Sequence, residues 1–221
     1  MTELAVHDLG RASYADAEAL QRRLLERVRA GERTGHVVLV EHDPAVITLG
    51  RRGRREHILV SDEELRRAGI EVVASARGGD VTWHGPGQLV AYPIISLRPR
   101  LRSVAGHVRA LEQAAIGVLA EFGITGARRR GRPGVWVGES APGEKVAAVG
   151  VAVSRWVSWH GLALNVASDL TGFGLIVPCG LGGTRVTSLS RLLGREMAVE
   201  EVKPPLVTHL RQALDLRSPK G

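Results

Sequence analysis

Residues 145–166, KVAAVGVAVSRWVSWHGLALNV, decide the fold class that the sequence predicts. Two apolar runs, 145–153 and 158–166, are rich in valine, alanine and leucine and flank a short polar stretch, as in two adjacent β-strands. A third run, GVWV at 134–137, comes shortly before them. Three strands in succession do not fit a parallel sheet in which strands alternate with helices, so a mixed sheet is favoured.

Helices and further strands are predicted on both sides of this region. Apolar residues recur at helical spacing in several segments, between a capping serine and a glycine. Helices are expected at 13–31, 61–69, 103–123 and 187–194, and from 199 onward with an interruption or restart at Pro204-Pro205. Further strands are expected at 36–42, 45–50, 70–75 and 89–97. We therefore predict a single α+β domain over residues 1–221, with a mixed β-sheet flanked by helices.

The composition is that of a globular protein with excess positive charge. Hydrophobic residues make up 44% of the 221 residues, charged residues make up 24%, and the formal net charge is +7 at pH 7. No apolar run approaches the ~20 residues that span a bilayer, and the first residues lack the pattern of a secretion signal. We expect a cytoplasmic protein without membrane association, whose positive balance favours an acidic partner, either nucleic acid or protein.

Cys179 is the only cysteine and lies in the stretch GLIVPCGLGG, residues 174–183. A lone cysteine is commonly a small buried hydrophobic residue. Pro178 and Gly180, however, are poor residues for the interior of a strand or helix, so a loop is expected, where catalytic groups concentrate. Gly180 would also let backbone N–H groups turn toward an oxyanion. We predict that Cys179 is a nucleophile, which needs a nearby cation or base to form the thiolate at neutral pH.

Lys145 is the predicted cation. It opens an otherwise uncharged strand in a chain whose 30 Lys and Arg residues include only three lysines. A lysine at a strand end is often simply solvated, but a lysine can exchange a proton, whereas an arginine effectively cannot. A Cys–Lys pair would let one ammonium stabilise the thiolate and then shuttle protons to and from the reacting groups.

The glycine-rich segment RGGDVTWHGPGQ, residues 77–88, is the predicted binding trough. A dinucleotide-binding loop is excluded because no helix begins at its last glycine. A surface loop is the plain alternative, yet Trp83 and the apolar run after it indicate that the segment enters the core. Glycines there let a ligand approach the backbone closely, which suits an elongated apolar ligand.

His84 and His160 are interpreted as hydrogen-bonding structural histidines. No carboxylate or second histidine stands at ligand spacing from either, so we predict neither a metal site nor a cofactor. Arginines 128–130 and 132 form a basic cluster, which is usual for a solvated loop and could also contact an acidic partner.

Several separated segments form a pattern that is more specific than any one of them. They are RGGDVTWHGPGQLVAYPI at 77–94, KVAAVGVAV at 145–153, HGLALNV at 160–166, IVPCGL at 176–181 and TSL at 187–189. Together with EHDPAVITLGR at 41–51 and the spacing of Tyr14 and Gln21, this pattern resembles the lipoyl(octanoyl) transferase family. The resemblance covers about residues 10–194, and Trp83 stands where the family more usually has tyrosine.

The resemblance implies a biotin/lipoate protein ligase-like fold and an octanoyltransferase. Such an enzyme takes an octanoyl group from octanoyl-acyl carrier protein and places it on a specific lysine of a lipoyl domain, in 2-oxoacid dehydrogenase complexes or in the glycine cleavage H protein. It implies that Cys179 carries the acyl group as a thioester and that Lys145 favours the thiolate. The residues implied to line the acyl site are Arg77, Gly78, Gly79, Asp80, Val81, Thr82, Trp83, His84, Ala148, Val149, Gly150, Gly161, Leu162 and Ala163.

Three alternatives to this function stay open. An ATP-dependent lipoate–protein ligase on the same fold would form an acyl-adenylate and would not need Cys179. A nucleic-acid-binding module is supported only by the positive charge, without an RNA-binding or helix-turn-helix pattern, and we expect no nucleic-acid partner. A cysteine hydrolase lacks an evident His–Asp pair in the sequence.

Overall fold

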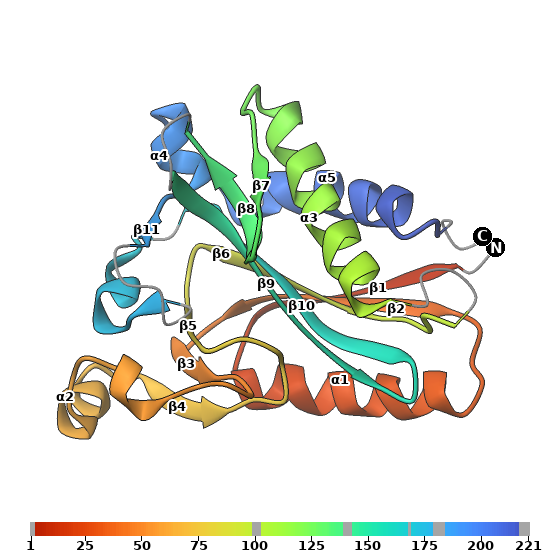
Figure 1. Ribbon diagram of the computed structural model, residues 1–221, viewed down its shortest axis with the longest axis horizontal. Helices are drawn as coiled ribbons and strands as arrows, with labels where there is room; N and C mark the ends of the chain where they lie inside the picture. The colour runs from red at the N-terminus through yellow and green to blue at the C-terminus, as the bar shows by residue number, and fades with distance from the viewer. Residues whose placement is uncertain (1–2, 99–102, 139–142, 168, 179–183, 217–221) are drawn as a thin grey trace.

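The computed structural model of the chain describes residues 3–98, 103–138, 143–167, 169–178 and 184–216. Its centre is a twisted eight-stranded sheet, and a three-stranded sheet lies beside it (Figure 1). The strands of the large sheet are, in spatial order, β1 (Leu4–Ala12), β2 (Gly35–His42), β6 (Gln88–Ile94), β10 (Val157–Asn165), β9 (Glu144–Ser154), β8 (Arg132–Val137) and β7 (Ala127–Arg129), with β11 (Arg185–Val186) paired to β9. The small sheet consists of β4 (Glu71–Ala74), β3 (Val46–Leu49) and β5 (Val81–His84).

The large sheet is mixed in strand direction. β1 runs parallel to β2, and β11 runs parallel to β9. The pairs β2–β6, β6–β10, β10–β9, β9–β8 and β8–β7 are antiparallel. The predicted α+β class is therefore confirmed, including the three consecutive strands on which the prediction rested.

Helices cover both faces of the large sheet (Figure 1). α1 (Tyr14–Arg29) lies on one face, and α3 (Val104–Glu121) and α5 (Val199–Ala213) lie on the other. Short helices occupy the connections: α2 (Asp62–Arg67), α4 (Leu189–Leu193) and the 3₁₀ turns η1 (Arg55–His57) and η2 (Thr171–Leu175). None of the helices in the described residues is long and apolar enough to cross a membrane.

The predicted helix starts are confirmed by their caps. The hydroxyl of Ser13 accepts a hydrogen bond from the N–H of Asp16, and Ser61 forms a reciprocal capping box with Glu64. The hydroxyl of Ser103 caps α3 by accepting a hydrogen bond from the N–H of Gly106. These side chains accept from backbone N–H groups that have no partner within the first turn of a helix.

α5 differs from the prediction because it runs without interruption through Pro204 and Pro205. Each proline removes one backbone donor from the helix. Val202, Leu206 and Leu210 are buried on one side of α5 in the cluster that includes α3. Their burial holds the helix together across the two missing hydrogen bonds.

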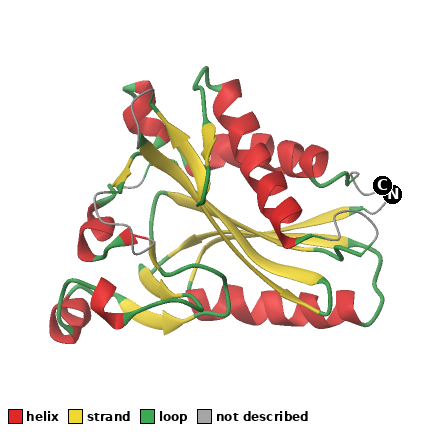
Figure 2. Cartoon of the chain, viewed as in Figure 1, coloured by secondary structure: helices red, strands yellow, loops and turns green. Residues whose placement is uncertain are grey.

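The core consists of three apolar clusters, and Figure 2 shows the helices, in red, on both sides of the strands, in yellow. The largest fills the space between the large sheet, α3 and α5, and a second lies between the sheet and α1. The third joins the small sheet to α2 and η2 through Ile47, Leu65, Trp83 and Phe173. The small sheet therefore has an apolar core of its own.

Candidate functional site

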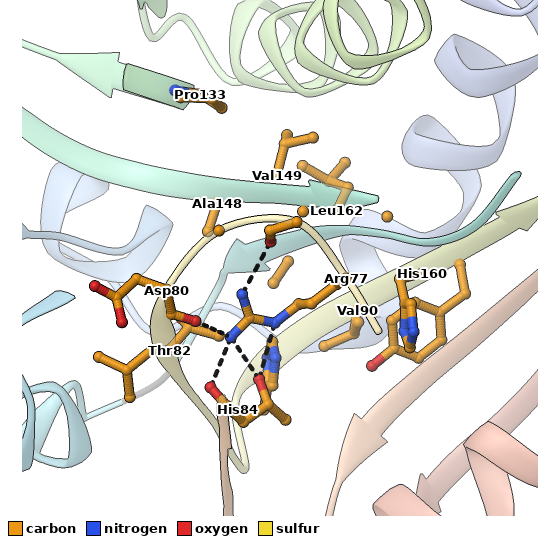
Figure 3. Close-up of a pocket in the computed structure, with 18 of the residues that line it drawn as sticks. Arg77, Asp80, Thr82, His84, Val90, Pro133, Ala148, Val149, His160 and Leu162 are labelled. Carbon is orange, nitrogen blue, oxygen red and sulfur yellow. Dashed lines mark hydrogen bonds between the residues drawn. The ribbon is translucent and has the colours of Figure 1, made fainter. Parts of the chain in front are cut away.

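A cavity lies where the small sheet meets the large one (Figure 3). Its volume is about 60 Å³, and part of it opens to solvent. Residues 77–84 form one wall, which we call the roof, and β9 and β10 form the opposite wall. The predicted binding trough and the strand pair that decided the fold class thus enclose a single space.

Four small residues form the floor of the cavity. Ala148 lies opposite Ala163, and Gly150 opposite Gly161, in the antiparallel register of β9 and β10. A Cβ atom on Gly150 would lie 3.0 Å from the carbonyl oxygen of Gly78 and 3.3 Å from Cδ of Arg77. The lack of a side chain at Gly150 therefore lets the roof approach the sheet.

Gly161 is required for a different reason. A Cβ atom there would point at the carbonyl oxygen of Ala91 and lie 2.7 Å from Cδ of Pro93, both on the neighbouring β6. Gly161 borders the cavity, but its missing side chain makes room for a strand.

Arg77 holds the roof in place, and Figure 3 shows its guanidinium at the centre of the dashed hydrogen bonds. The side chain is buried, and Nη2 donates to the carbonyl oxygens of Thr48 at 2.6 Å and of Asp80 at 2.9 Å. Nε donates to the Thr48 hydroxyl at 3.0 Å, and Nη1 donates to the carbonyl of Gly78 at 3.2 Å. A planar guanidinium suits this task because its N–H groups point in fixed, diverging directions.

Lys145 lies inside the cavity wall and is only 5% exposed. Its Nζ donates to the carbonyl oxygen of Pro133 at 3.1 Å and lies 4.8 Å from the centre of the Trp136 ring. The alternative interpretation from the sequence, in which Lys145 is a solvated residue at a strand end, is therefore wrong. A buried cation held by a carbonyl and an aromatic face is placed to act on a bound ligand; its catalytic role stays a prediction.

Cys179 lies outside the described residues. The chain leading to it is described as far as Pro178 and runs beside η1. Ile176 forms an antiparallel bridge with Ile58, and the N–H of Val177 donates to the carbonyl of His57 at 2.8 Å. The role of Cys179 stays a prediction.

The cavity brings together most of the predicted acyl-site residues with Lys145. Trp83 is the exception, because neighbouring residues of β5 alternate in direction and Trp83 points away from the cavity. Its ring packs edge-on against Phe173 at 5.5 Å in the core of the small sheet. The predicted residues that line the cavity are Arg77, Gly78, Gly79, Asp80, Val81, Thr82, His84, Ala148, Val149, Gly150, Gly161, Leu162 and Ala163.

A group of buried polar side chains at the cavity was not predicted as part of the site. Tyr14, Tyr92 and His160 line the space together with Thr48, Val90 and Pro133. The Tyr14 hydroxyl donates to the Ser75 hydroxyl at 3.0 Å, and the Tyr92 hydroxyl lies 2.8 Å from Nε2 of His42. Tyr14 and Tyr92 stood within the pattern that supported the resemblance, but nothing in their spacing indicated that they would meet.

Burial keeps these side chains neutral at pH 7. Desolvation raises the pKa of Tyr14 and raises that of Tyr92 well above its usual value. Desolvation also lowers the pKa of His42 to about 4 and that of His160 to about 3, and nearby arginines add to the shift of His160. This part of the cavity is therefore polar but uncharged, because none of these side chains changes its protonation state near neutral pH.

His160 differs from the hydrogen-bonding histidine that the sequence suggested. Its backbone N–H donates to Oε1 of Gln21 at 2.9 Å, whereas the ring atom Nε2 is buried without a partner among the described residues. The ring stacks on Trp159 with a centroid distance of 4.2 Å. Packing therefore holds the ring at the cavity.

Asp80 and His57 meet at the roof. Nδ1 of His57 lies 2.6 Å from Oδ2 of Asp80, without the alignment of a hydrogen bond. The backbone N–H of Arg54 donates to Oδ1 of Asp80 at 3.2 Å. No group of three histidine, aspartate or glutamate side chains suited to a metal ion occurs in the part of the chain that the structure describes.

The fold is that of the biotin and lipoate protein ligases. A bipartite lipoate protein ligase from Thermoplasma acidophilum superposes with a TM-score of 0.78 at 14% identity, over 100% of this chain and 87% of that one. A biotin protein ligase from Aquifex aeolicus gives a TM-score of 0.54 at 15% identity, over 97% and 70%. The predicted biotin/lipoate protein ligase-like fold is therefore confirmed.

The sequence comparison then gives the family. Residues 13–211 match the lipoyl protein ligase A/B catalytic domain, and the chain belongs to that family. An octanoyltransferase of Syntrophobacter fumaroxidans is 50% identical over 208 residues, which cover 94% of this chain and 89% of that protein. An octanoyltransferase of Solibacter usitatus is 45% identical over 221 residues, covering 100% and 97%.

Proposed function

We propose that this protein is an octanoyltransferase of protein lipoylation, which carries the octanoyl group on Cys179. The observation that carries the proposal is the buried Lys145 in the wall of a cavity floored by Gly150, Gly161 and two alanines. An uncharged chain fits along such a floor, and a cation beside it serves a thiolate. Relatives named octanoyltransferase over nearly the whole chain support the same reaction.

In the first half-reaction, the Cys179 thiolate attacks the carbonyl carbon of an octanoyl thioester, for which we propose octanoyl-acyl carrier protein. The new C–S bond forms as the donor's C–S bond breaks. The Lys145 ammonium gives one proton to the departing thiolate, which leaves as a thiol, and Lys145 becomes a neutral amine. One thioester replaces another, so no ATP is needed.

In the second half-reaction, a lysine of a lipoyl domain enters as the free amine after losing one proton to solvent. Its nitrogen attacks the thioester carbon, a C–N bond forms, and Cys179 departs as thiolate. Neutral Lys145 takes the proton that the nitrogen gives up and becomes an ammonium again. The amide product is more stable than the thioester, which draws the transfer to completion.

The charge of the chain suits two acidic protein partners that bind in turn. The formal net charge is +7, and a positive surface speeds the encounter with an acidic protein. We propose acyl carrier protein as the donor, lipoyl domains of 2-oxoacid dehydrogenase complexes and the glycine cleavage H protein as acceptors, and the cytoplasm as the place of reaction.

Intact-mass measurement tests the intermediate. The parent protein mixed with octanoyl-acyl carrier protein and no acceptor is expected to gain one octanoyl group, which hydroxylamine removes as it does a thioester. Cys179→Ala is expected to gain none. An adduct that persists in Cys179→Ala would refute the assignment, and transfer that requires ATP would favour a lipoate–protein ligase instead.

A further inference from the structure

A relay of buried side-chain amides leads to His84. Nδ2 of Asn165 donates to the carbonyl oxygen of Thr187 at 3.0 Å, and Nε2 of Gln88 donates to Oδ1 of Asn165 at 2.9 Å. Oε1 of Gln88 then lies 2.7 Å from Nδ1 of His84. Asn165, Gln88 and His84 are all buried, so these hydrogen bonds do not compete with bulk water.

The relay has only one possible direction. The Thr187 carbonyl can only accept, so Asn165 must present its NH₂ group there and its oxygen toward Gln88. Gln88 must in turn present its NH₂ to Asn165 and its oxygen to His84. An amide oxygen only accepts, so the proton of His84 sits on Nδ1 and the lone pair on Nε2.

The relay starts on the strand of Lys145 and ends at the cavity. The N–H of Thr187 donates to the carbonyl oxygen of Lys145 at 3.0 Å. Asn165 pairs with Gln88 in the register of β10 and β6, and His84 lines the same cavity as Lys145. Nε2 of His84 has no hydrogen bond within the described residues. Unlike Nε2 of His160, this atom is not completely inaccessible to solvent.

We propose that Gln88 and Asn165 are positioning residues, which hold His84 so that Nε2 accepts one N–H of the attacking lysine. This inference rests on the proposed function. A free amine has two N–H hydrogens: one passes to Lys145 during the attack, and the other stays in the amide product. His84 holds the retained hydrogen and thereby turns the nitrogen lone pair toward the thioester carbon.

His84 suits the role of a hydrogen-bond acceptor that does not itself become protonated. Burial, and then the neighbouring His42, lower its pKa well below the usual value, although the bond to Gln88 raises it. Arg77 and His160 face the ring as well and lower the pKa further. His84 therefore remains neutral throughout the range in which the transfer would run.

Nitrogen-detected NMR of the ¹⁵N-histidine-labelled full chain tests the tautomer. The His84 signals, assigned with His84→Gln, are expected to show a protonated Nδ1 and an unprotonated Nε2 at pH 7. A proton on Nε2 would overturn the inference. This measurement uses the parent protein and does not depend on whether any variant folds.

Gln88→Glu tests the role in catalysis. A carboxylate beside Nδ1 favours the imidazolium, in which Nε2 is a donor and no longer an acceptor. Once the octanoyl adduct has formed, the rate of its reaction with a lipoyl domain is expected to fall roughly 100-fold at pH 7. A loss of this size is typical when a reacting group is held about 1 Å out of place. Formation of the adduct should fall far less, and the second rate should recover as pH rises and the imidazolium loses its proton.

Gln21→Glu is the matched control, because it also puts a buried carboxylate beside a cavity histidine, His160. It is expected to leave the His84 signals unchanged. An adduct that reacts with the lipoyl domain equally fast in Gln88→Glu and the parent would overturn the inference alone. Failure of the parent to form any adduct would overturn the proposed function, and the role of His84 with it.

Discussion

The floor and the roof of the cavity are built in opposite ways. The floor is made of small residues: two alanines and two glycines pair across β9 and β10. The roof is shaped by one long side chain, Arg77, whose guanidinium bonds to Thr48, Gly78 and Asp80. Substitutions in the floor should therefore change the space available to a ligand, whereas substitutions in the roof should change where that wall lies.

The largest expected effect concerns Lys145, the charged side chain that β9 contributes beside the floor. In Lys145→Arg, octanoyl transfer should fall roughly 100-fold or more, the scale of losing an acid–base group, because arginine cannot release its proton. The Cys179 thiol should still react with small alkylating agents at neutral pH, because a cation remains. Comparing the alkylation rate with the transfer rate separates the two roles.

Lys203→Arg is the control for this substitution. Lys203 pairs with Asp8 at 3.0 Å and does not line the cavity, so both rates should stay at the parental level. Lys145→Ala should lose both alkylation and transfer. Near-parental transfer by Lys145→Arg would reduce the lysine to a fixed charge, and unchanged alkylation of Lys145→Ala would separate it from Cys179.

The next effect distinguishes the two floor glycines. Gly161→Ala should destabilise the fold by about 3 kcal/mol, because the added methyl meets the backbone of β6 and neither strand can move away. Gly150→Ala should fold and shift transfer toward acyl groups shorter than octanoyl, because its methyl meets only the roof. Urea unfolding and a comparison of hexanoyl with octanoyl transfer measure these outcomes. Equal stability of the two variants would contradict the distinction between Gly161, which faces β6, and Gly150, which faces the roof.

Arg77→Lys tests the roof. A lysine cannot reproduce the fork that reaches Thr48 and Asp80 together, so buried carbonyls lose donors and stability should fall by about 2–3 kcal/mol. Arg51→Lys is the matched control, because Arg51 is exposed and donates through Nε to a single carbonyl, that of Ala76. Equal unfolding midpoints for these two variants would mean that the guanidinium fork does not hold the roof.

The smallest effect concerns His107 on α3, which does not line the cavity and therefore isolates the effect of burial. Desolvation lowers its pKa from 6.5 to about 4, and neither ring nitrogen has a partner among the described residues. The unfolded chain therefore binds the proton more readily, so this stability is complete above pH 6.5 and is lost as pH falls toward 4. His107 should account for about 2 kcal/mol of the loss between pH 7 and pH 5.

Urea unfolding of His107→Leu at pH 7 and pH 5 checks this prediction. The variant should lose less stability between the two pH values than the parent by about 2 kcal/mol. His42 and His160, whose pKa values are about 4 and about 3, remain in both proteins and keep part of the dependence. An identical pH dependence in parent and variant would contradict the buried neutral state of His107.

Local patterns predicted much of the fold. The runs of β9 and β10 follow from their valine, alanine and leucine content, and the starts of α1, α2 and α3 follow from serine caps. Four strands escaped prediction: β1, β5, β7 and β11. β1 alternates partly buried and exposed residues without a strong apolar run, and β5 is a short strand inside a glycine-rich segment. β1 and β5 form because each pairs with a neighbouring strand, β1 with β2 and β5 with β3.

The site was predicted less evenly than the fold. Residues 77–82 and 84 and the floor of β9 and β10 were assigned to the site from the resemblance, and they line one cavity. Tyr92 and His160 were not assigned to the site, because a polar side chain in an apolar strand indicates neither its depth nor its neighbours. Trp83 was assigned to it, and only the alternation of β5 shows that the ring belongs to the core of the small sheet.

By itself, the sequence determined which chemical groups the protein carries and which segments with a strong local pattern, such as β9, β10 and α3, become strands and helices, because these depend on neighbours along the chain. The tertiary structure alone decided that residue 77 lies against residue 150, that Lys145 is buried over Trp136, and that Asn165 acts on His84 through Gln88. The physical reason is that burial and the direction of a hydrogen bond are properties of a packed arrangement. Segments that are far apart in the sequence must come together before a side chain is desolvated, or before hydrogen-bond partners fix the orientation of a side-chain amide.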